Sequence, residues 1–492
     1  MPLASIKIPA GVRAHGTEFE SANRWLDVNL VRWRDGSMRP IGGWTARLES
    51  AVAAPPRGAV SWIDNSDVSR LATGTYNKLY YVSPAGSVSD ITPVGLTAGN
   101  IDAQLNIGYG GSFYGSYTYG TTRPNTGVYL ECTTWSLDNW GEYLVACSVD
   151  DGKLYEWQLN AATPAAQISN SPSDCVGLMV TEERFLFALG AGGNPRLVQW
   201  CDKQDNTTWT PSATNEAGDF ELQTNGEILC GLRARGRALI LTTTDAHAAT
   251  YIGPQLVYSF ERVGTSCGAI SRKAAVSFDQ GSYWMGTKGF YMFDGSAVRE
   301  MPCEVIDHVF NNMNTAQRSK IFAVHNSQFG EVWWFYPSKS SNENDSYVIY
   351  DYKENHWNIG LLNRTTGVDA GVFRNPIWFD EDGNMYNHED GFDHGTYESY
   401  AESGPILIGD GDAVAKINQL VPDELTQGQV TVSFKTRFHP NDTERSYGPY
   451  STANPTDVRF TGRQFRIRIN GSELNNWRFG IPRLNIISGG RR

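Results

Sequence analysis

The chain has 492 residues, of which 40% are hydrophobic, 12% aromatic and 19% charged, and it contains 50 glycines. This composition excludes a disordered or coiled-coil chain and favours a large, mainly β protein with many tight turns. The net charge of −12 disfavours a protein that grips DNA through its phosphates, because like charges repel.

The cysteines predict neither a disulfide framework nor a zinc site. There are seven of them, which is an odd number, they are widely spaced, and no CxxC pair occurs. We therefore expect small buried thiols in a protein made in a reducing compartment. The first residues lack the pattern of a signal peptide, and no apolar run approaches the length of a membrane span.

Residues 1–50 are predicted to be extended. Two strand-like runs, 25–33 and 38–44, flank the turn pair Asp35-Gly36.

Residues 51–399 carry a repeating pattern of aromatic strand-like runs and glycine-containing turns. Residues 78–82 (KLYYV) lead through a turn at 84–86 into 88–93, and residues 282–285 lead through Lys288-Gly289 into 290–293. The repeat is irregular, at roughly 40–60 residues, which is typical of β-propeller blades with insertions. A large β-sandwich built from hairpins is the alternative that the pattern leaves open.

One short helix is predicted within this region, at residues 303–314. Val305, Val309 and Met313 are spaced at i, i+4 and i+8, which places them on one helical face.

From about residue 400 the pattern changes to strands with one buried face, at 430–438 and 464–469, which predicts a separate sheet within 400–492. Between Arg459 and Arg492 there are eight arginines against the single acid Glu473. Alternating arginines often form only a solvated strand face. The near absence of acids indicates instead a surface for acidic partner patches or phosphates.

No site for chemistry stands out. The densest histidine and carboxylate cluster is 388–394, which contains His388, Glu389, Asp390, Asp393 and His394, but its glycines favour a polar turn over a metal site. Residues 380–384 have the wrong register for a calcium loop. The adjacent pairs Asp150-Asp151 and Glu182-Glu183 point to opposite strand faces and cannot act on one bond. We therefore expect no enzyme, no catalytic residue, no cofactor and no metal.

Several segments resemble the tail nozzle, or tail hub, proteins of short-tailed bacteriophages. These segments are 30–44, 263–268 (VGTSCG), 283–295 (YWMGTKGFYMFDG), 302–310, 331–337 (EVWWFYP) and 477–492 (WRFGIPRLNIISGGRR). They are strands and turns, so they indicate lineage rather than a catalytic site.

The resemblance implies an irregular β-propeller at residues 51–399 with one short helix insert. It also implies a second β domain, the platform, which is made from both chain ends, residues 1–50 and 400–492. It implies a structural virion protein, a homohexamer that forms a ring-shaped channel below the head-to-tail adaptor, retains packaged DNA and conducts it during ejection. Tail fibres or spikes and the host outer surface are the other implied partners. The expected location is the virion tail, assembled in the host cytoplasm.

An acidic channel would let double-stranded DNA pass without specific binding. Arg466, Arg468, Arg491 and Arg492 are the residues predicted to contact another subunit or the adaptor. A propeller tail protein that binds glycans or degrades polysaccharides is the alternative function.

Overall fold

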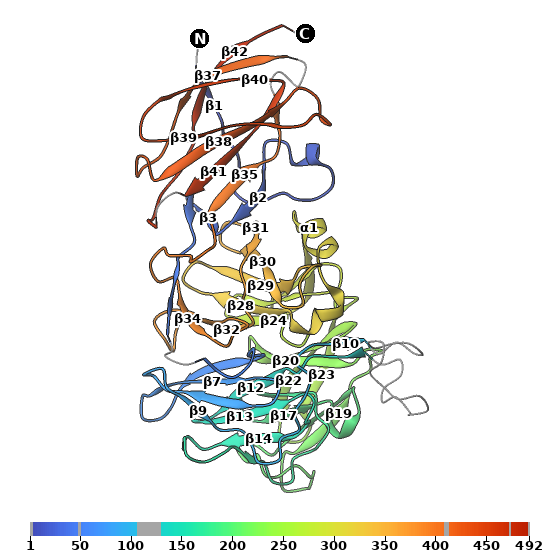
Figure 1. Ribbon diagram of the computed structural model, residues 1–492. Helices are drawn as coiled ribbons and strands as arrows, with labels where there is room; N and C mark the ends of the chain where they lie inside the picture. The colour runs from blue at the N-terminus through green and yellow to red at the C-terminus, as the bar shows by residue number, and fades with distance from the viewer. Residues whose placement is uncertain (1–2, 48–50, 106–128, 408–412, 472–473, 491–492) are drawn as a thin grey trace, which may run out of the picture.

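The computed structural model describes residues 3–47, 51–105, 129–407, 413–471 and 474–490 (Figure 1). Almost all regular structure in these residues is antiparallel β-sheet, with one α-helix, α1 (Ile306–Asn311). None of the described helices is long and apolar enough to span a membrane. The propeller occupies the lower part of Figure 1 and the platform the upper part.

Within the described residues, the propeller has seven four-stranded blades. In the first six blades, the strands pair in sequence order. Blade 1 comprises β6 (Ala59–Ile63), β7 (Ser69–Gly74), β8 (Leu79–Val82) and β9 (Val88–Asp90). Blade 2 comprises β12 (Trp135–Trp140), β13 (Tyr143–Ser148), β14 (Leu154–Trp157) and β15 (Ala166–Gln167). Blade 3 comprises β16 (Gly177–Val180), β17 (Leu186–Leu189), β18 (Leu197–Trp200) and β19 (Gly218–Glu221).

The next three blades follow the same order. Blade 4 comprises β20 (Ile228–Ala234), β21 (Arg237–Thr242), β22 (Asp245–Gly253) and β23 (Val257–Thr265). Blade 5 comprises β24 (Ala275–Phe278), β25 (Gly281–Met285), β26 (Phe290–Phe293) and β27 (Val298–Met301). Blade 6 comprises β28 (Phe322–Asn326), β29 (Glu331–Pro337), β30 (Asn344–Asp351) and β31 (His356–Leu361).

Blade 7 closes the ring with a strand from the other end of the chain. It comprises β32 (Thr366–Val368), β33 (Ile377–Phe379), β34 (Met385–His388) and β5 (Trp44–Ala46). Asn387 is paired with Thr45 and His388 with Trp44. The sequence-based division placed residues 44–46 with the platform, but they pair within the propeller. The first strand of each blade contacts the first strand of the next, and β32 contacts β6.

Aromatic side chains fill the spaces between blades. Between blades 1 and 2, Trp62 and Tyr81 pack with Trp135 and Trp157 in one buried cluster. The indole of Trp135 donates a hydrogen bond to the carbonyl of Thr75, at 2.6 Å. A Cβ added at Gly74 would lie 2.3 Å from the Trp135 ring, so this close approach of two blades requires glycine.

The platform is a sandwich of two sheets. The first pairs β1 (Ala4–Ser5), β42 (Arg483–Ser488), β37 (Ala415–Val421) and β40 (Thr456–Gly462). The second pairs β2 (Trp25–Asn29), β35 (Tyr400–Ser403), β41 (Gln464–Gly471), β38 (Val430–Arg437) and β39 (Arg445–Ser451), with β36 (Ile406–Leu407) beside β41. The predicted alternation is confirmed, because Val432, Phe434 and Ile467 are buried between the sheets.

The fold class predicted from the sequence is confirmed: a propeller, a β platform formed by both chain ends, and a short helix. The helix is shorter than predicted, but Val305, Val309 and Met313 are buried as expected. The remaining described elements are β3 (Val31–Arg34), β4 (Ser37–Pro40), β10 (Gln104–Leu105), β11 (Tyr129–Leu130) and the 3₁₀ helices η1 (Glu18–Ser21), η2 (Ala191–Gly193) and η3 (Thr315–Lys320). All seven cysteines are free thiols, five of them buried.

Candidate functional site

The predicted arginines Arg466 and Arg468 lie on the outer face of the platform, because β41 buries Phe465, Ile467 and Ile469 on its other face. Arg468 is in register with Glu402 of β35, whose side chain is only 6% exposed. The strand pairing thus brings the arginines to a nearly buried carboxylate.

Both arginines form ion pairs within the chain. Glu402 is 2.8 Å from Lys435 Nζ, 3.3 Å from Arg468 Nη1 and 3.6 Å from Arg466 Nη1. Arg466 also pairs with Glu18 and, at 3.0 Å, with Glu444.

The Arg468 guanidinium additionally lies 3.7 Å from the centre of the Tyr400 ring. Arg466 and Arg468 therefore hold strands of the platform together, and their contact with a partner stays a prediction. Arg491 and Arg492 lie outside the described residues.

A second group of cations on the platform was not singled out in the sequence. Lys416, Arg459 and Arg483 are exposed on the outer face of the sheet that contains β37, β40 and β42. No described residue forms an ion pair with any of these three side chains. Strand alternation around Arg459 and Arg483 is the signal that could have identified this face.

The cluster at 388–394 does not converge on one point. His388 Nε2 accepts a hydrogen bond from Arg364 Nε at 2.8 Å, and burial holds the pKa of His388 well below its ordinary value. Asp390 accepts a hydrogen bond from Thr45 at 2.6 Å, and His394 Nε2 lies 2.8 Å from the carbonyl oxygen of Ile41. These residues attach the N-terminal segment to blade 7. No group of three or more histidine, cysteine or carboxylate side chains among the described residues could hold a metal ion.

The adjacent carboxylates Asp150 and Asp151, which the sequence offers as a pair, also have different hydrogen-bond partners. Asp150 accepts a hydrogen bond from Thr133 at 2.5 Å, whereas Asp151 accepts one from Tyr155 at 2.5 Å. Asp380 accepts hydrogen bonds from the backbone of Asp382 at 3.0 Å and of Asn384 at 2.8 Å, which makes it the organiser of a hairpin turn.

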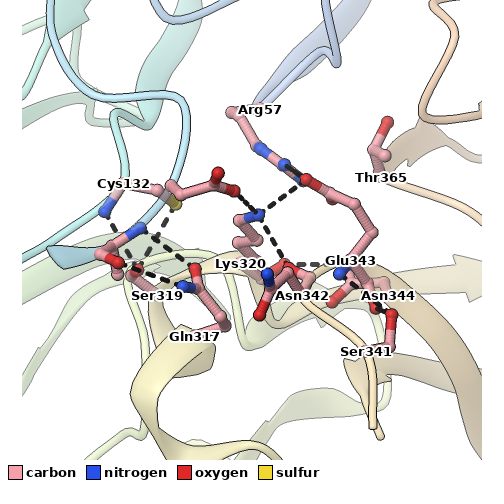
Figure 2. Close-up of polar contacts among 12 residues, drawn as sticks. Arg57, Cys132, Gln317, Ser319, Lys320, Ser341, Asn342, Glu343, Asn344 and Thr365 are labelled. Carbon is pink, nitrogen blue, oxygen red and sulfur yellow. Dashed lines mark hydrogen bonds and ion pairs between the residues drawn. The ribbon is translucent and has the colours of Figure 1, made fainter. Parts of the chain in front are cut away.

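A buried charged cluster joins blade 6 to the entry of blade 1 (Figure 2). Lys320 is 2% exposed, and its Nζ donates to Asp102 at 2.5 Å, Glu343 at 2.6 Å and the carbonyl of Asn342 at 2.7 Å. Arg57 donates to both oxygens of Glu343, at 2.6 and 2.7 Å. Lys320, Asp102 and Glu343 belong to different segments of the chain, so their ion pairs hold these segments together.

A cavity of about 430 Å³ lies on the axis of the propeller, between the inner strands β6, β12, β16, β20, β24 and β32. Each of these strands is hydrogen-bonded to another strand on one side only. Some of the free edge groups are satisfied by side chains of a neighbouring blade. Ser136 donates to the carbonyl of Leu178 at 2.7 Å, and Asp138 accepts from the amide of Val180 at 2.9 Å.

Five charged residues line the axial cavity: Arg233, Arg272, Lys273, Asp138 and Asp369. Arg233 pairs with Asp138, and Arg272 pairs with Glu131 at 3.1 Å. Asp369 lies 2.8 Å from His325 Nδ1. Burial raises the pKa of Asp138 even though Arg233 lowers it.

Solved structures similar to this chain are β-propellers. Virginiamycin B lyase from Staphylococcus aureus is 7% identical, with 70% of this chain and 97% of the lyase covered and a TM-score of 0.42. The WD40 propeller domain of Doa1 is 9% identical, with coverages of 70% and 96% and a TM-score of 0.41. BamB from Moraxella catarrhalis is 13% identical, with coverages of 71% and 99% and a TM-score of 0.31. No protein-family model and no curated protein matches the chain.

These comparisons correct one expectation. The sequence-based expectation that the chain is not an enzyme does not stand as a conclusion, because the similar solved structures include a lyase and the lack of a catalytic motif therefore does not exclude catalysis. At this level of identity the likeness shows the fold alone, so it assigns no reaction and no catalytic residue to this chain.

Proposed function

We propose that this chain is the nozzle, or hub, of a short phage tail. In this proposal a homohexameric ring lies below the head-to-tail adaptor, carries tail fibres or spikes, retains packaged double-stranded DNA and conducts it toward the host surface during ejection. The protein would be assembled in the host cytoplasm and located in the virion tail.

The observation that carries this proposal is the division of the chain into a propeller and a platform made from both ends. Strand β1, near the N-terminus, pairs with β42, near the C-terminus, in one sheet of the platform. This is the architecture implied by the resemblance of segments such as 283–295 and 477–492 to nozzle proteins.

The distribution of charge gives further support. Residues 1–50 and 400–492 together contain 19 lysines and arginines against 14 aspartates and glutamates, whereas residues 51–399 contain 22 against 39. A net positive platform and a strongly negative propeller favour a contact between the platform and an acidic protein surface. The acidic propeller also disfavours adhesion to DNA phosphates.

Electron microscopy of purified particles that contain this protein tests the proposal. We expect a six-fold ring of this chain on the portal axis, and we expect particles that lack it to lose their DNA. A trimeric or peripheral location would refute the nozzle role. In that case, binding and cleavage assays with host-surface polysaccharide would become the next measurements.

A further inference from the structure

The axial cavity contains one cation, Lys273, that forms no ion pair within the part of the chain that the structure describes. Lys273 lies two residues before the start of β24, and its carbonyl accepts a hydrogen bond from the amide of Ala323 at 2.7 Å, which fixes its backbone. Its ammonium group forms no hydrogen bond or ion pair with another described residue. The two neighbouring cations differ, since Arg233 pairs with Asp138 and Arg272 with Glu131.

The surroundings of Lys273 oppose a free positive charge. Burial lowers the pKa of Lys273 to about 8, although Cys230, Asp138 and Cys147 act in the opposite direction. A partly buried ammonium without a counter-ion is costly, and a bound anion would remove that cost. The two acids of the cavity are already engaged, Asp138 by Arg233 and Asp369 by His325.

The cavity wall supplies further donors. The inner strands have unpaired edges, and an unpaired strand edge presents backbone N–H groups as well as carbonyls. At about 430 Å³ the cavity has room for roughly a dozen waters at their liquid volume, so an ion of a few heavy atoms fits. Backbone amides and a lysine together form a common type of binding site for phosphate and carboxylate groups.

We propose that the axial cavity of the propeller binds a small oxyanion, phosphate or a short carboxylate, with the Lys273 ammonium as its counter-charge. The inference rests on the cavity alone and does not depend on the proposed function. An axial anion would bridge inner strands of different blades and would stabilise the closed ring by mass action.

Isothermal titration of the full chain with sodium phosphate, and separately with sodium acetate, tests the site and distinguishes its two possible ligands. We expect one saturable site per chain for at least one of them. Lys273→Met should weaken binding by roughly tenfold or more, because a charge-assisted contact is lost, and Lys273→Arg should retain it. The matched control is Lys288→Met, which removes an exposed cation that pairs with no described residue and should leave binding unchanged.

A second measurement uses the unmodified protein and so does not depend on a variant that folds. Labelling with an N-hydroxysuccinimide ester, read by mass spectrometry, should modify Lys273 more slowly in the presence of the bound anion, with labelling of Lys288 unchanged. Absence of saturable binding to the native chain, or equal binding by the Lys273→Met and Lys288→Met variants, would overturn the proposal. Equal labelling of Lys273 with and without the anion would overturn it as well.

Discussion

Replacing Arg32 with methionine should destabilise the protein more than any exposed arginine replacement. Arg32 is 2% exposed and lies in β3, between two nearly buried carboxylates. Its Nε and Nη2 donate to Glu331 at 2.8 and 2.9 Å, and its Nη1 and Nη2 donate to Glu389 at 3.0 and 2.5 Å. The Phe329 ring covers the guanidinium at 3.6 Å.

The expected magnitude follows from what the substitution leaves behind. Breaking a buried ion pair by removing one partner costs about 3–5 kcal/mol, because an uncompensated charge remains. Burial already raises the pKa of Glu331 in the intact protein, and Arg32 counteracts that effect. Without Arg32, the folded-state pKa of Glu331 should rise further above its unfolded value. The loss in free energy of unfolding caused by Arg32→Met should therefore be largest at neutral pH and should become smaller as the pH falls toward about 5.

Urea unfolding followed by tryptophan fluorescence measures the effect, with the midpoint of the same transition compared between variants. The control is Arg24→Met, because Arg24 forms a 2.6 Å pair with Glu304 whose side chain is 40% exposed. We expect this control to lose about 0–1 kcal/mol. The triple variant Arg32→Met, Glu331→Gln, Glu389→Gln should recover part of the lost stability, since it removes the charges of all three residues together. If Arg32→Met matched the Arg24 control, or if the triple variant were less stable than Arg32→Met, the reasoning would be refuted.

Three further predictions concern the propeller. Lys320→Met should lower the free energy of unfolding by about 2 kcal/mol, because it removes charge-assisted hydrogen bonds to Asp102 and Glu343, although Glu343 keeps its contact with Arg57. Urea unfolding beside the exposed control Lys339→Met measures this, and equal loss in both variants would contradict it. Gly74→Ala should cost about 1–3 kcal/mol through the clash with Trp135, and an unchanged unfolding midpoint would show that blades 1 and 2 are less tightly packed than described. Burial raises the pKa of all seven cysteine thiols. Ellman's reagent at pH 8 should therefore react slowly with the native chain and should detect seven thiols per chain after unfolding. Prompt reaction of several thiols in the native chain would contradict their burial.

The parts of the fold that local patterns determine were predictable from the sequence. Alternation along 464–469 predicted the buried face of β41, and the spacing of Val305 and Val309 predicted the buried face of α1. Both predictions depend only on the direction of side chains within one element, which follows from the spacing of the residues in the sequence.

Features that depend on distant partners were not predictable. Strand β5 has three residues, and its partner β34 lies more than 300 residues away in the chain, so nothing local marks residues 44–46 as part of a blade. The same applies to the arginines of β41. Their spacing indicated an exposed basic face, but Glu402 and Glu18 neutralise it from other segments. Lys273 carries no local signal either, because only ring closure places it at the axis.

The strand that completes blade 7 also sets an order of events during synthesis. Strand β5 can pair with β34 only after residues 385–388 have been synthesised. By then six blades and most of the seventh have already been made. Pairing of β1 with β42 comes later still, because it needs residues 483–488. Closure of the ring and assembly of the platform are thus late steps with large loops to close, and a chain truncated before residue 385 would leave β33 as an open sheet edge.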